Sequence, residues 1–210
     1  IDPTSSYAQS AAWAMGRAMD AQIIAAFNGR ASTGVAGGTT TDFPVDGSQL
    51  VAVGSTNLSF AKLRSALQIF QENDVDPDEE KFIVVKPSQI QAMLATEQAT
   101  SADYHNVKAL ISGELNQFMG FTFIINNLIG NAATNAGETD MTGYSAASTT
   151  DHCIAWVRSG VELGIGADIK ARISERPDKA YSTYVYYAMS IGATRLEEKK
   201  VVQIDCKNDA

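Results

Sequence analysis

The chain has 210 residues, of which 45% are hydrophobic and 19% are charged, and this suits one compact domain or two small subdomains that share a core. Its net charge of −8 disfavours long-range attraction to nucleic acid or to anionic lipid. No stretch approaches the ~18 continuous apolar residues of a membrane helix, and the first residues lack the basic start and apolar run of a signal peptide.

The N-terminal part is expected to form one long helix over residues 4–28. Apolar side chains recur in it at three- and four-residue steps and make one stripe, Ala12, Met15, Met19, Ile23 and Ala26. Many of the other residues are small, which favours close packing under a sheet. Gly29 is a natural stop, and residues 30–47 predict a loop or loose hairpin that turns at Gly37-Gly38.

The middle of the chain is expected to mix helices with short strands. A helix over residues 59–73 has Ser59 as its expected N-cap, and the polar run 74–80 follows its end. Short apolar runs at residues 82–85 and 121–125 are typical of buried strands.

Two more helical pieces and one long loop complete this part. Pro87 suits the first position of a helix, and residues 101–112 carry apolar side chains along one side of another. Residues 129–150 are small and polar without periodicity, which predicts a long exposed loop.

The C-terminal third is expected to consist of strands. Residues 153–163 predict one strand, and residues 169–174 predict a half-buried strand because apolar and polar side chains alternate there. Residues 181–195 alternate for far longer than an average strand of five or six residues. Residues 201–204 form a last strand. This order of elements argues for an α+β fold with antiparallel pairing.

An acidic run, Asp74, Asp76 and Asp78, has the first three ligand spacings of a calcium-binding loop. The other positions do not fit, because Glu79 stands where the loop needs glycine and Val85 stands where it needs a bidentate glutamate. A solvated turn is therefore the favoured interpretation.

Asp151, His152 and Cys153 have the residue types of a cysteine nucleophile site. Sequence neighbours on a strand point to opposite faces, so these three cannot easily form a proton relay. The other histidine, His105, has no cysteine or carboxylate at ligand spacing. No catalytic, cofactor-binding or metal-binding residue is assigned, and the chain is not expected to be an enzyme or to hold a cofactor.

Two further motifs and the cysteines have plain interpretations. Gly164-Ile165-Gly166 begins like a dinucleotide fingerprint, but Ile169 replaces the third glycine, so a bend between two strands is favoured. Asn57-Leu58-Ser59 matches a glycosylation acceptor and equally a helix cap, which is preferred. Cys153 and Cys206 are expected to be two reduced, mostly buried thiols, although a bridge stays open.

Four segments occur together in one order along the chain. Each segment alone is a weak signal, and their order and spacing together are specific. They are the acidic turn 74–80 followed by Ile83-Val84-Val85-Lys86-Pro87, then Phe118-Met119-Gly120-Phe121, then Glu175-Arg176-Pro177-Asp178-Lys179, and last Met189-Ser190-Ile191-Gly192-Ala193-Thr194-Arg195. In this order, from about Thr4 to Cys206, the chain resembles the major capsid protein of tailed bacteriophages.

The resemblance implies the tailed-phage major capsid fold with two subdomains. Residues 1–45 and 168–198 would form a peripheral subdomain of a long spine helix plus a long β-hairpin. Residues 46–167 and 199–210 would form an axial subdomain, a mixed sheet flanked by helices. Family members carry an N-terminal arm and an extended loop before the spine helix, and nothing precedes Ile1 here, so an N-terminal truncation is expected.

The resemblance also implies a structural protein that self-assembles into the hexamers and pentamers of an icosahedral phage head. It would be made in the host cytoplasm and reside in the virion. Its partners would be copies of itself and other head proteins such as portal or scaffold, with DNA enclosed but not specifically bound and no membrane involved. An encapsulin-like compartment shell, a small enzyme with a site near Asp151–Cys153, and a secreted adhesin-like module stay open as alternatives.

Overall fold

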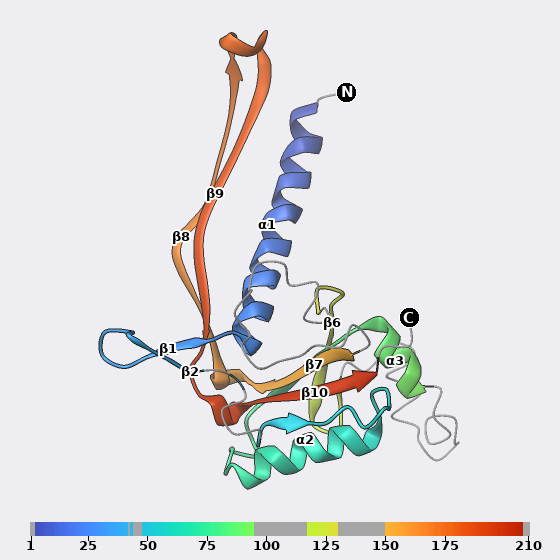
Figure 1. Cartoon of the computed structure of the whole chain (residues 1–210). Coiled ribbons are helices and arrows are strands. Elements are labelled where there is room, and N and C mark those ends of the chain that lie inside the picture. The colour runs from blue at the N-terminus through green and yellow to red at the C-terminus, as the bar shows by residue number, and fades with distance from the viewer. Residues whose placement is uncertain (1–2, 42, 44–47, 95–116, 130–149, 208–210) are drawn as a thin grey trace.

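The computed structural model of the chain describes residues 3–41, 43, 48–94, 117–129 and 150–207. These residues form a body, built on a six-stranded sheet, and a long arm. In the arm, helix α1 (Pro3–Asn28) runs beside a two-stranded ribbon of β8 (Val161–Arg176) and β9 (Ser182–Arg195). Figure 1 shows α1 and this ribbon rising from the same side of the body, with the start of α1 toward the tip of the ribbon.

The sheet of the body has the strand order β3-β10-β7-β4-β6-β5. Its strands are β3 (Leu50–Val51), β4 (Lys81–Val85), β5 (Gln117–Phe118), β6 (Phe121–Ile125), β7 (Thr150–Val157) and β10 (Val201–Lys207). The pairs β3–β10 and β4–β6 are parallel and the other three are antiparallel. The sheet is therefore mixed, and the expectation of antiparallel pairing is wrong for two of its pairs. Helix α3 (Pro87–Leu94) lies in the connection from β4 to β6, as the crossover of a parallel pair requires.

Alternate residues of the central strands point to two faces, and each face has its own apolar cluster. On one face, α2 (Phe60–Glu72) packs Leu63, Ala66 and Phe70 against the sheet. The sheet residues of this cluster include Ile83, Val85, Cys153, Ala155, Val202 and Ile204. On the other face, the end of α1 packs Ile24 and Phe27 against Val84, Ile154 and Val201. The long helix thus belongs to the arm along most of its length and to the core at its end.

The start of α2 is held differently from the prediction. Ser59 is the N-cap residue as predicted, but within the described residues its hydroxyl makes no capping hydrogen bond. The backbone N–H of Leu58 instead donates to Gln89 Oε1 at 2.9 Å. A side chain of α3 therefore fixes the residue that precedes the N-cap, without replacing the cap itself, and Asn57-Leu58-Ser59 lies at the entrance to a helix.

The C-terminal strands have other boundaries than predicted. In place of one strand over 153–163, β7 ends at Val157, a 3-10 turn η1 (Arg158–Gly160) follows, and β8 begins. Residue 160 lies against Lys200 in this turn, and a glycine is needed there because a Cβ would lie 2.9 Å from the Lys200 Cβ. At Gly164–Gly166 the chain stays within one strand, β8, and does not divide into the two expected strands, but register shifts between Ile165 and Lys170 mark an irregularity there.

The remaining predicted elements agree with the structure where it describes them. The long helix, the strand runs at 82–85 and 121–125, the helix from Pro87 and the very long strand β9 are confirmed. The glycine-rich connection contains a short ribbon, β1 (Ala31–Thr33) and β2 (Thr39–Thr41), which confirms the hairpin. Its turn is closed by Gly37 N–H donating to Gly34 O at 3.1 Å, so the predicted turn at Gly37-Gly38 is wrong and the chain turns over residues 34–37. The predicted helix 101–112 with His105, and the interior of the predicted loop 129–150, lie outside the described residues.

The α+β class is confirmed by this arrangement of helices and a mixed sheet. Across the described part of the chain, no helix combines the length and the apolar character needed to cross a membrane.

Candidate interaction surface

The arm is held together by one apolar face of the β8–β9 ribbon, which packs against α1. Val185, Tyr187, Met189 and Ile191 alternate along β9 on this face and are half-buried. The Tyr187 hydroxyl donates to the Ala8 carbonyl oxygen at 3.2 Å, an approach that the small residues of α1 allow. α1 lies mainly over β9 and only marginally over β8, so half of this face stays open.

The packed stripe of α1 is shifted slightly from the predicted one. Met15, Met19, Ile23 and Ala26 are half-buried as the spacing predicts. Ala12 is exposed, however, and the stripe continues towards the N-terminus through Ala11 and Ala8, which are half-buried. This shift of the stripe is consistent with the shape of the ribbon on which α1 packs, because a twisted ribbon contacts a different line of helix residues than a flat sheet does.

The open half of the apolar face lies on β8. Ile165 stands opposite Ile191 and Ile173 stands opposite Val185, yet Ile165 is 58% exposed and Ile173 is 51% exposed. The prediction of a half-buried strand at 169–174 is therefore wrong for β8 in this chain alone. Other exposed large apolar side chains of the arm are Tyr7, Trp13, Ile169, Tyr181, Tyr184 and Tyr186.

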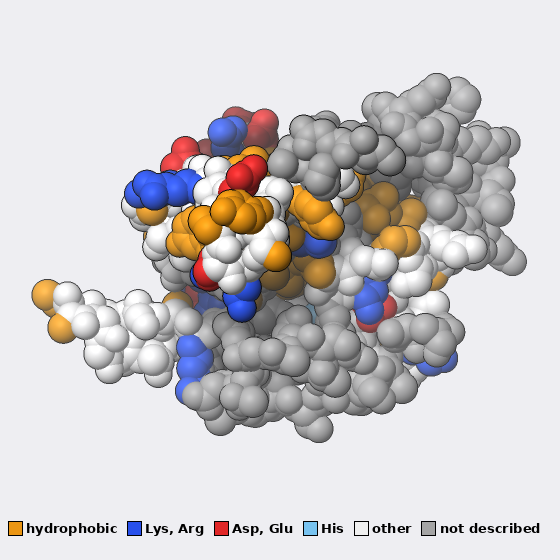
Figure 2. Space-filling view, turned by 90° about the horizontal axis from the view of Figure 1, so that it is seen from above, with side chains coloured by type: hydrophobic (Ala, Val, Ile, Leu, Met, Phe, Trp, Pro, Cys, Tyr) orange, Lys and Arg blue, Asp and Glu red, His pale blue; other side chains and the backbone are white. Residues whose placement is uncertain are grey.

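Figure 2 looks down onto the top of the molecule and shows apolar side chains in the open there, next to cationic and anionic ones. The short β1–β2 ribbon projects at one side with apolar atoms at its tip, where Val35 is fully exposed. Contiguous exposed apolar surface of this kind marks an interaction site more often than a free surface.

The outer face of the ribbon, away from α1, has a different character. It forms a shallow groove of about 600 Å³ lined by Ala167, Lys170, Arg172, Ser174, Tyr184, Tyr186, Ala188, Met189 and Ser190. The rings of Tyr184 and Tyr186 stack with their centroids 6.3 Å apart, and the Arg176 guanidinium carbon lies 5.5 Å from the Tyr184 ring centroid. This face is therefore aromatic and cationic, whereas the inner face is aliphatic apart from Tyr187 and Met189.

The tip of the ribbon is a tight turn with unusual backbone geometry. It contains the 3-10 turn η2 (Pro177–Lys179), and Arg176 contacts both carboxylate oxygens of Asp178, at 3.0 and 2.7 Å. Ala180 and Tyr181 then take positive φ values of 54° and 58°, which residues other than glycine rarely adopt. The exposed Tyr181 ring is thus presented at the far end of the arm.

Arg195, the last residue of β9, joins the arm to the body. Its side chain is buried, and Nη1 donates to the carbonyl oxygens of Phe27 and Gly29 at 2.7 Å each and of Ala26 at 3.3 Å. Carbonyls at the end of a helix lack partners within the helix and carry the negative end of its dipole, so a cation there is favourable. The guanidinium carbon also lies 4.7 Å from the Phe43 ring centroid. One side chain thus connects the end of α1 with the root of the ribbon.

An aromatic row extends this joint into the sheet. The rings of Phe27 and Trp156 have centroids 4.6 Å apart, and those of Trp156 and Phe82 lie 5.7 Å apart in a stacked arrangement. At the root of the ribbon, the Gly160 carbonyl oxygen accepts the Leu196 N–H at 2.9 Å. The arm is therefore anchored by packing as well as by the Arg195 hydrogen bonds.

The residues weighed as a nucleophile site lie on two faces of β7. Asp151 and Cys153 point to the α2 side, where Asp151 accepts hydrogen bonds from Lys86 Nζ and, at 3.0 Å, from Gln89 Nε2. His152 points to the opposite face, where its Nδ1 lies 2.7 Å from Asp205 Oδ1. The strand itself therefore separates the imidazole from the thiol.

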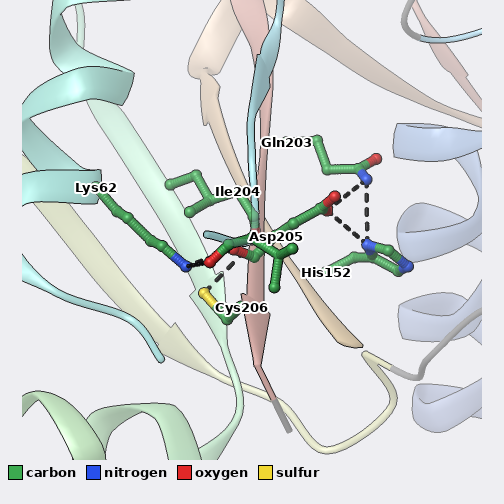
Figure 3. A network of polar contacts seen from close by, with 7 residues as sticks. Lys62, His152, Gln203, Ile204, Asp205 and Cys206 are labelled. Carbon is green, nitrogen blue, oxygen red and sulfur yellow. Dashed lines mark hydrogen bonds and ion pairs between the residues drawn. The ribbon is translucent and has the colours of Figure 1, made fainter. Parts of the chain in front are cut away.

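Figure 3 shows how β10 carries polar contacts on both of its sides. On one side, Gln203 Nε2 donates to Asp205 Oδ1 at 2.8 Å and completes the group around His152. On the other side, Lys62 Nζ donates to the Asp205 backbone oxygen at 2.7 Å, and burial lowers the pKa of this lysine, although Cys206, Cys153 and Asp205 oppose the shift. These contacts connect neighbouring secondary-structure elements, and none of them joins His152 to Cys153.

Cys153 and Cys206 are free thiols buried in the core, as expected. A hydrogen bond with Cys206, burial, and the nearby Asp151 raise the pKa of the Cys153 thiol well above 9.0. A thiol with a raised pKa is protonated at neutral pH and is a poor nucleophile.

The acidic turn 74–80 is closed by a lysine. Lys81 Nζ donates to the backbone oxygens of Asp76, Pro77 and Glu79 at 3.4, 3.0 and 3.1 Å. The cation that the turn carbonyls bind is thus the ammonium group of the chain itself. In the part of the chain that the structure describes, no group of three His, Cys, Asp or Glu residues is placed to hold a metal ion.

Sequence reasoning gave no role to Arg195, Gln89, Lys62 or Gln203, which make the central polar contacts. Gln203 did carry a signal, because it interrupts the apolar run of the last strand. Lys62 and Gln89 lie next to apolar positions of their helices and had no such signal. Arg195 belongs to a recognised motif, but only the fold brings it to the end of α1.

Comparisons with known proteins identify the family. The family model described as "Phage capsid protein" matches residues 1–208. No curated protein matches the chain in sequence.

Solved structures share the fold at low identity. The chain is similar to the capsid of cyanophage Pam1, with a TM-score of 0.68 and 14% identity over 99% of this chain and 69% of that one. For the head of Helicobacter pylori bacteriophage KHP40 the TM-score is 0.67 at 12% identity, over 99% and 70%. For the capsid of cyanophage P-SCSP1u it is 0.62 at 15% identity, over 100% and 67%.

These structures confirm the expected tailed-phage capsid fold. Sequence identities this low support a conclusion about the fold alone. The family match is independent of them and spans all but the last two residues. The chain belongs to the phage capsid protein family.

Proposed function

We propose that the protein is the structural subunit of an icosahedral phage head, in which it assembles into hexamers and pentamers around packaged DNA. The observation that carries this proposal is the match of the phage capsid family to residues 1–208. The fold supports it, because the same arrangement occurs in the capsids of cyanophage Pam1 and bacteriophage KHP40.

The geometry of the arm suits such a role. Assembly into a closed shell needs a repeated surface that is incomplete in one copy and is completed by its neighbours. The open half of the ribbon, with Ile165 and Ile173 exposed, and the exposed Trp13 on α1 supply apolar surface of this kind. Many weak contacts of this sort sum to a stable shell when they are made together.

Within this role, we assign two subdomains. Residues 1–45 and 168–198 form the peripheral one, which includes α1 and most of the ribbon, and residues 46–167 and 199–210 form the axial one, which includes the mixed sheet. The division is supported by the separate sheets of the two parts, since the β8–β9 ribbon and the six-stranded sheet share no strand pairing within the described residues.

The proposed role is structural and not catalytic. This is supported by the separation of His152 from Cys153 across β7 and by the raised pKa of the Cys153 thiol. The expected partners are other copies of the chain and other head proteins such as portal or scaffold. The net charge of −8 fits a wall that encloses DNA without binding it specifically. Synthesis in the host cytoplasm completes the proposal.

The test is electron microscopy of the full-length gene product expressed alone, together with its sedimentation profile. Closed shells of uniform diameter are expected. Ile165→Asp with Ile173→Asp places two charges on the open apolar face and is expected to prevent closure, whereas Ser65→Asp with Gln71→Asp, at exposed positions of α2, adds the same charge and serves as the control.

Dispersed small particles from the full-length wild type would argue against a shell protein. Shells that contain a protein cargo in place of DNA, when isolated from the native source, would instead assign the protein to a compartment shell.

A further inference from the structure

We infer that the outer groove of the β8–β9 ribbon binds the acidic turn, residues 74–80, of a second copy of this chain. The inference rests on the proposed function, because it names a contact between neighbouring subunits. It starts from the charges in the groove, which no described residue of the same chain compensates.

Lys170 and Arg172 lie side by side on the outer face of β8, opposite Ala188 and Tyr186. Both side chains are exposed, and within the described residues neither forms an ion pair, whereas Arg176 nearby is paired with Asp178 at 2.7 Å. In a chain with a net charge of −8, two adjacent free cations over a stacked tyrosine pair form a site for an anionic group.

The acidic turn has the complementary properties. Five of its seven residues, Asp74, Asp76, Asp78, Glu79 and Glu80, are acidic. Lys81 binds the turn from inside through three backbone carbonyls, and Asp76 Oδ1 accepts the Asp78 N–H at 3.0 Å. The turn is thus pre-organised, and the exposed carboxylates of Asp74 and Asp78 form no ion pair with described residues, so little ordering entropy opposes its binding.

The groove and the turn of one chain cannot meet. Glu80 Oε2 lies 3.3 Å from Arg158 Nη1, so the turn sits at the root of the ribbon. Because a strand rises about 3.3 Å per residue, Arg172 lies roughly 35 Å further along β8. The two surfaces therefore meet only between copies, as a head-to-tail contact of the kind that closes into rings.

The chemistry of the contact follows from the groups present. Arg172 offers a planar fork of N–H donors that matches a carboxylate, and Lys170 offers a second cation beside it. The hydroxyls of Tyr184 and Tyr186 add donors in the same groove. Asp74 and Asp78 of the neighbouring copy, both exposed, supply acceptors on the outside of a rigid turn.

The experiment is a charge exchange in the full-length protein. The groove variant is Lys170→Glu with Arg172→Glu, and the turn variant is Asp74→Lys with Asp78→Lys. Each variant alone places like charges against each other in the proposed contact. In a mixture of the two, the groove of one variant is again opposite in charge to the turn of the other.

Sedimentation velocity at low salt measures self-association, and circular dichroism checks that each variant is folded. Each variant alone is expected to self-associate on the order of tenfold more weakly than wild type, or weaker still, because two or more exposed ion pairs are replaced by repulsion. The mixture is expected to recover the wild-type value. Lys179→Glu with Lys199→Glu, which changes the charge equally at other exposed sites, is expected to associate like wild type.

Failure of the folded mixture to recover would overturn the inference and would point to a different acidic partner for the groove. An equal loss in the control pair would overturn it as well, because net charge alone would then explain the effect. Recovery without closed shells would leave this contact standing and refute the proposed function. Closed shells from either folded variant alone would refute this contact and leave the proposed function standing.

Discussion

The guanidinium of Arg195 is expected to be the strongest single connection between the arm and the body. Two of its hydrogen bonds, to the carbonyl oxygens of Phe27 and Gly29, are 2.7 Å long and buried. A hydrogen bond to a charged group contributes about 1.5–3 kcal/mol. Arg195→Met removes both and leaves buried carbonyls without this donor, so we expect the free energy of unfolding to fall by about 3–5 kcal/mol.

Urea unfolding followed by tryptophan fluorescence suits this measurement, because Trp156 lies 4.6 Å from Phe27 within the joint. Arg195→Lys keeps the charge but loses the fork of donors, and an intermediate loss is expected. Arg176→Met removes an exposed arginine of the same ribbon, which is paired with Asp178, and is expected to cost less than about 1 kcal/mol. A value for Arg195→Met within about 1 kcal/mol of wild type would refute the reasoning, since the joint would then not depend on this side chain.

Three further predictions concern the core and the root of the ribbon. Gly160→Ala places a Cβ 2.9 Å from the Lys200 Cβ and 3.1 Å from its carbonyl oxygen, so urea unfolding should show a loss of about 1–3 kcal/mol. Gly192→Ala, whose Cβ meets no described atom within 4 Å, is the matched control, and equal losses would contradict the steric argument. The raised pKa of the Cys153 thiol means that the unfolded thiol ionises at a lower pH than the folded one, so stability should fall as the pH rises above 9.0. Cys153→Ala should reduce this loss of stability with rising pH, and the same pH dependence of the free energy of unfolding in variant and wild type would contradict the prediction. Asp151→Ala removes a fully buried carboxylate from Lys86 and Gln89 and should cost about 3–5 kcal/mol; a loss no larger than that of the exposed Asp168→Ala would show that the contacts contribute little.

Local sequence patterns were sufficient for most of the elements. The spacing of Met15, Met19 and Ile23 predicts α1, and the long alternation of residues 181–195 predicts β9, because a helix and a strand place side chains on one face with different periods. Boundaries were less predictable. The break between β7 and β8 includes Gly160, where only a glycine fits beside Lys200, and this contact joins residues forty positions apart.

The polar contacts were the least predictable part of the molecule. Gln89 connects the start of α2 with β7 and with the end of β10, and no local pattern distinguishes it from an exposed glutamine on α3. The same holds for Arg195, whose partners lie more than 160 positions earlier in the chain. Hydrogen bonds of this kind need donor and acceptor in register in three dimensions, so they follow from the fold.

By itself, the sequence of this protein determined the class of the fold, the long helix, the very long strand and the order of motifs that resembles a phage capsid protein. The class and the two long elements depend on periodicity and composition, which are properties of neighbouring residues, whereas the resemblance depends on the order of particular motifs along the chain. The opposite faces of His152 and Cys153 also follow from strand alternation. Only the tertiary structure decided which half of the ribbon α1 covers, and that Lys170 and Arg172 share a groove with Tyr184 and Tyr186. The physical reason is that burial and charge pairing are set by residues distant in sequence, which meet only when the sheet and the arm are formed.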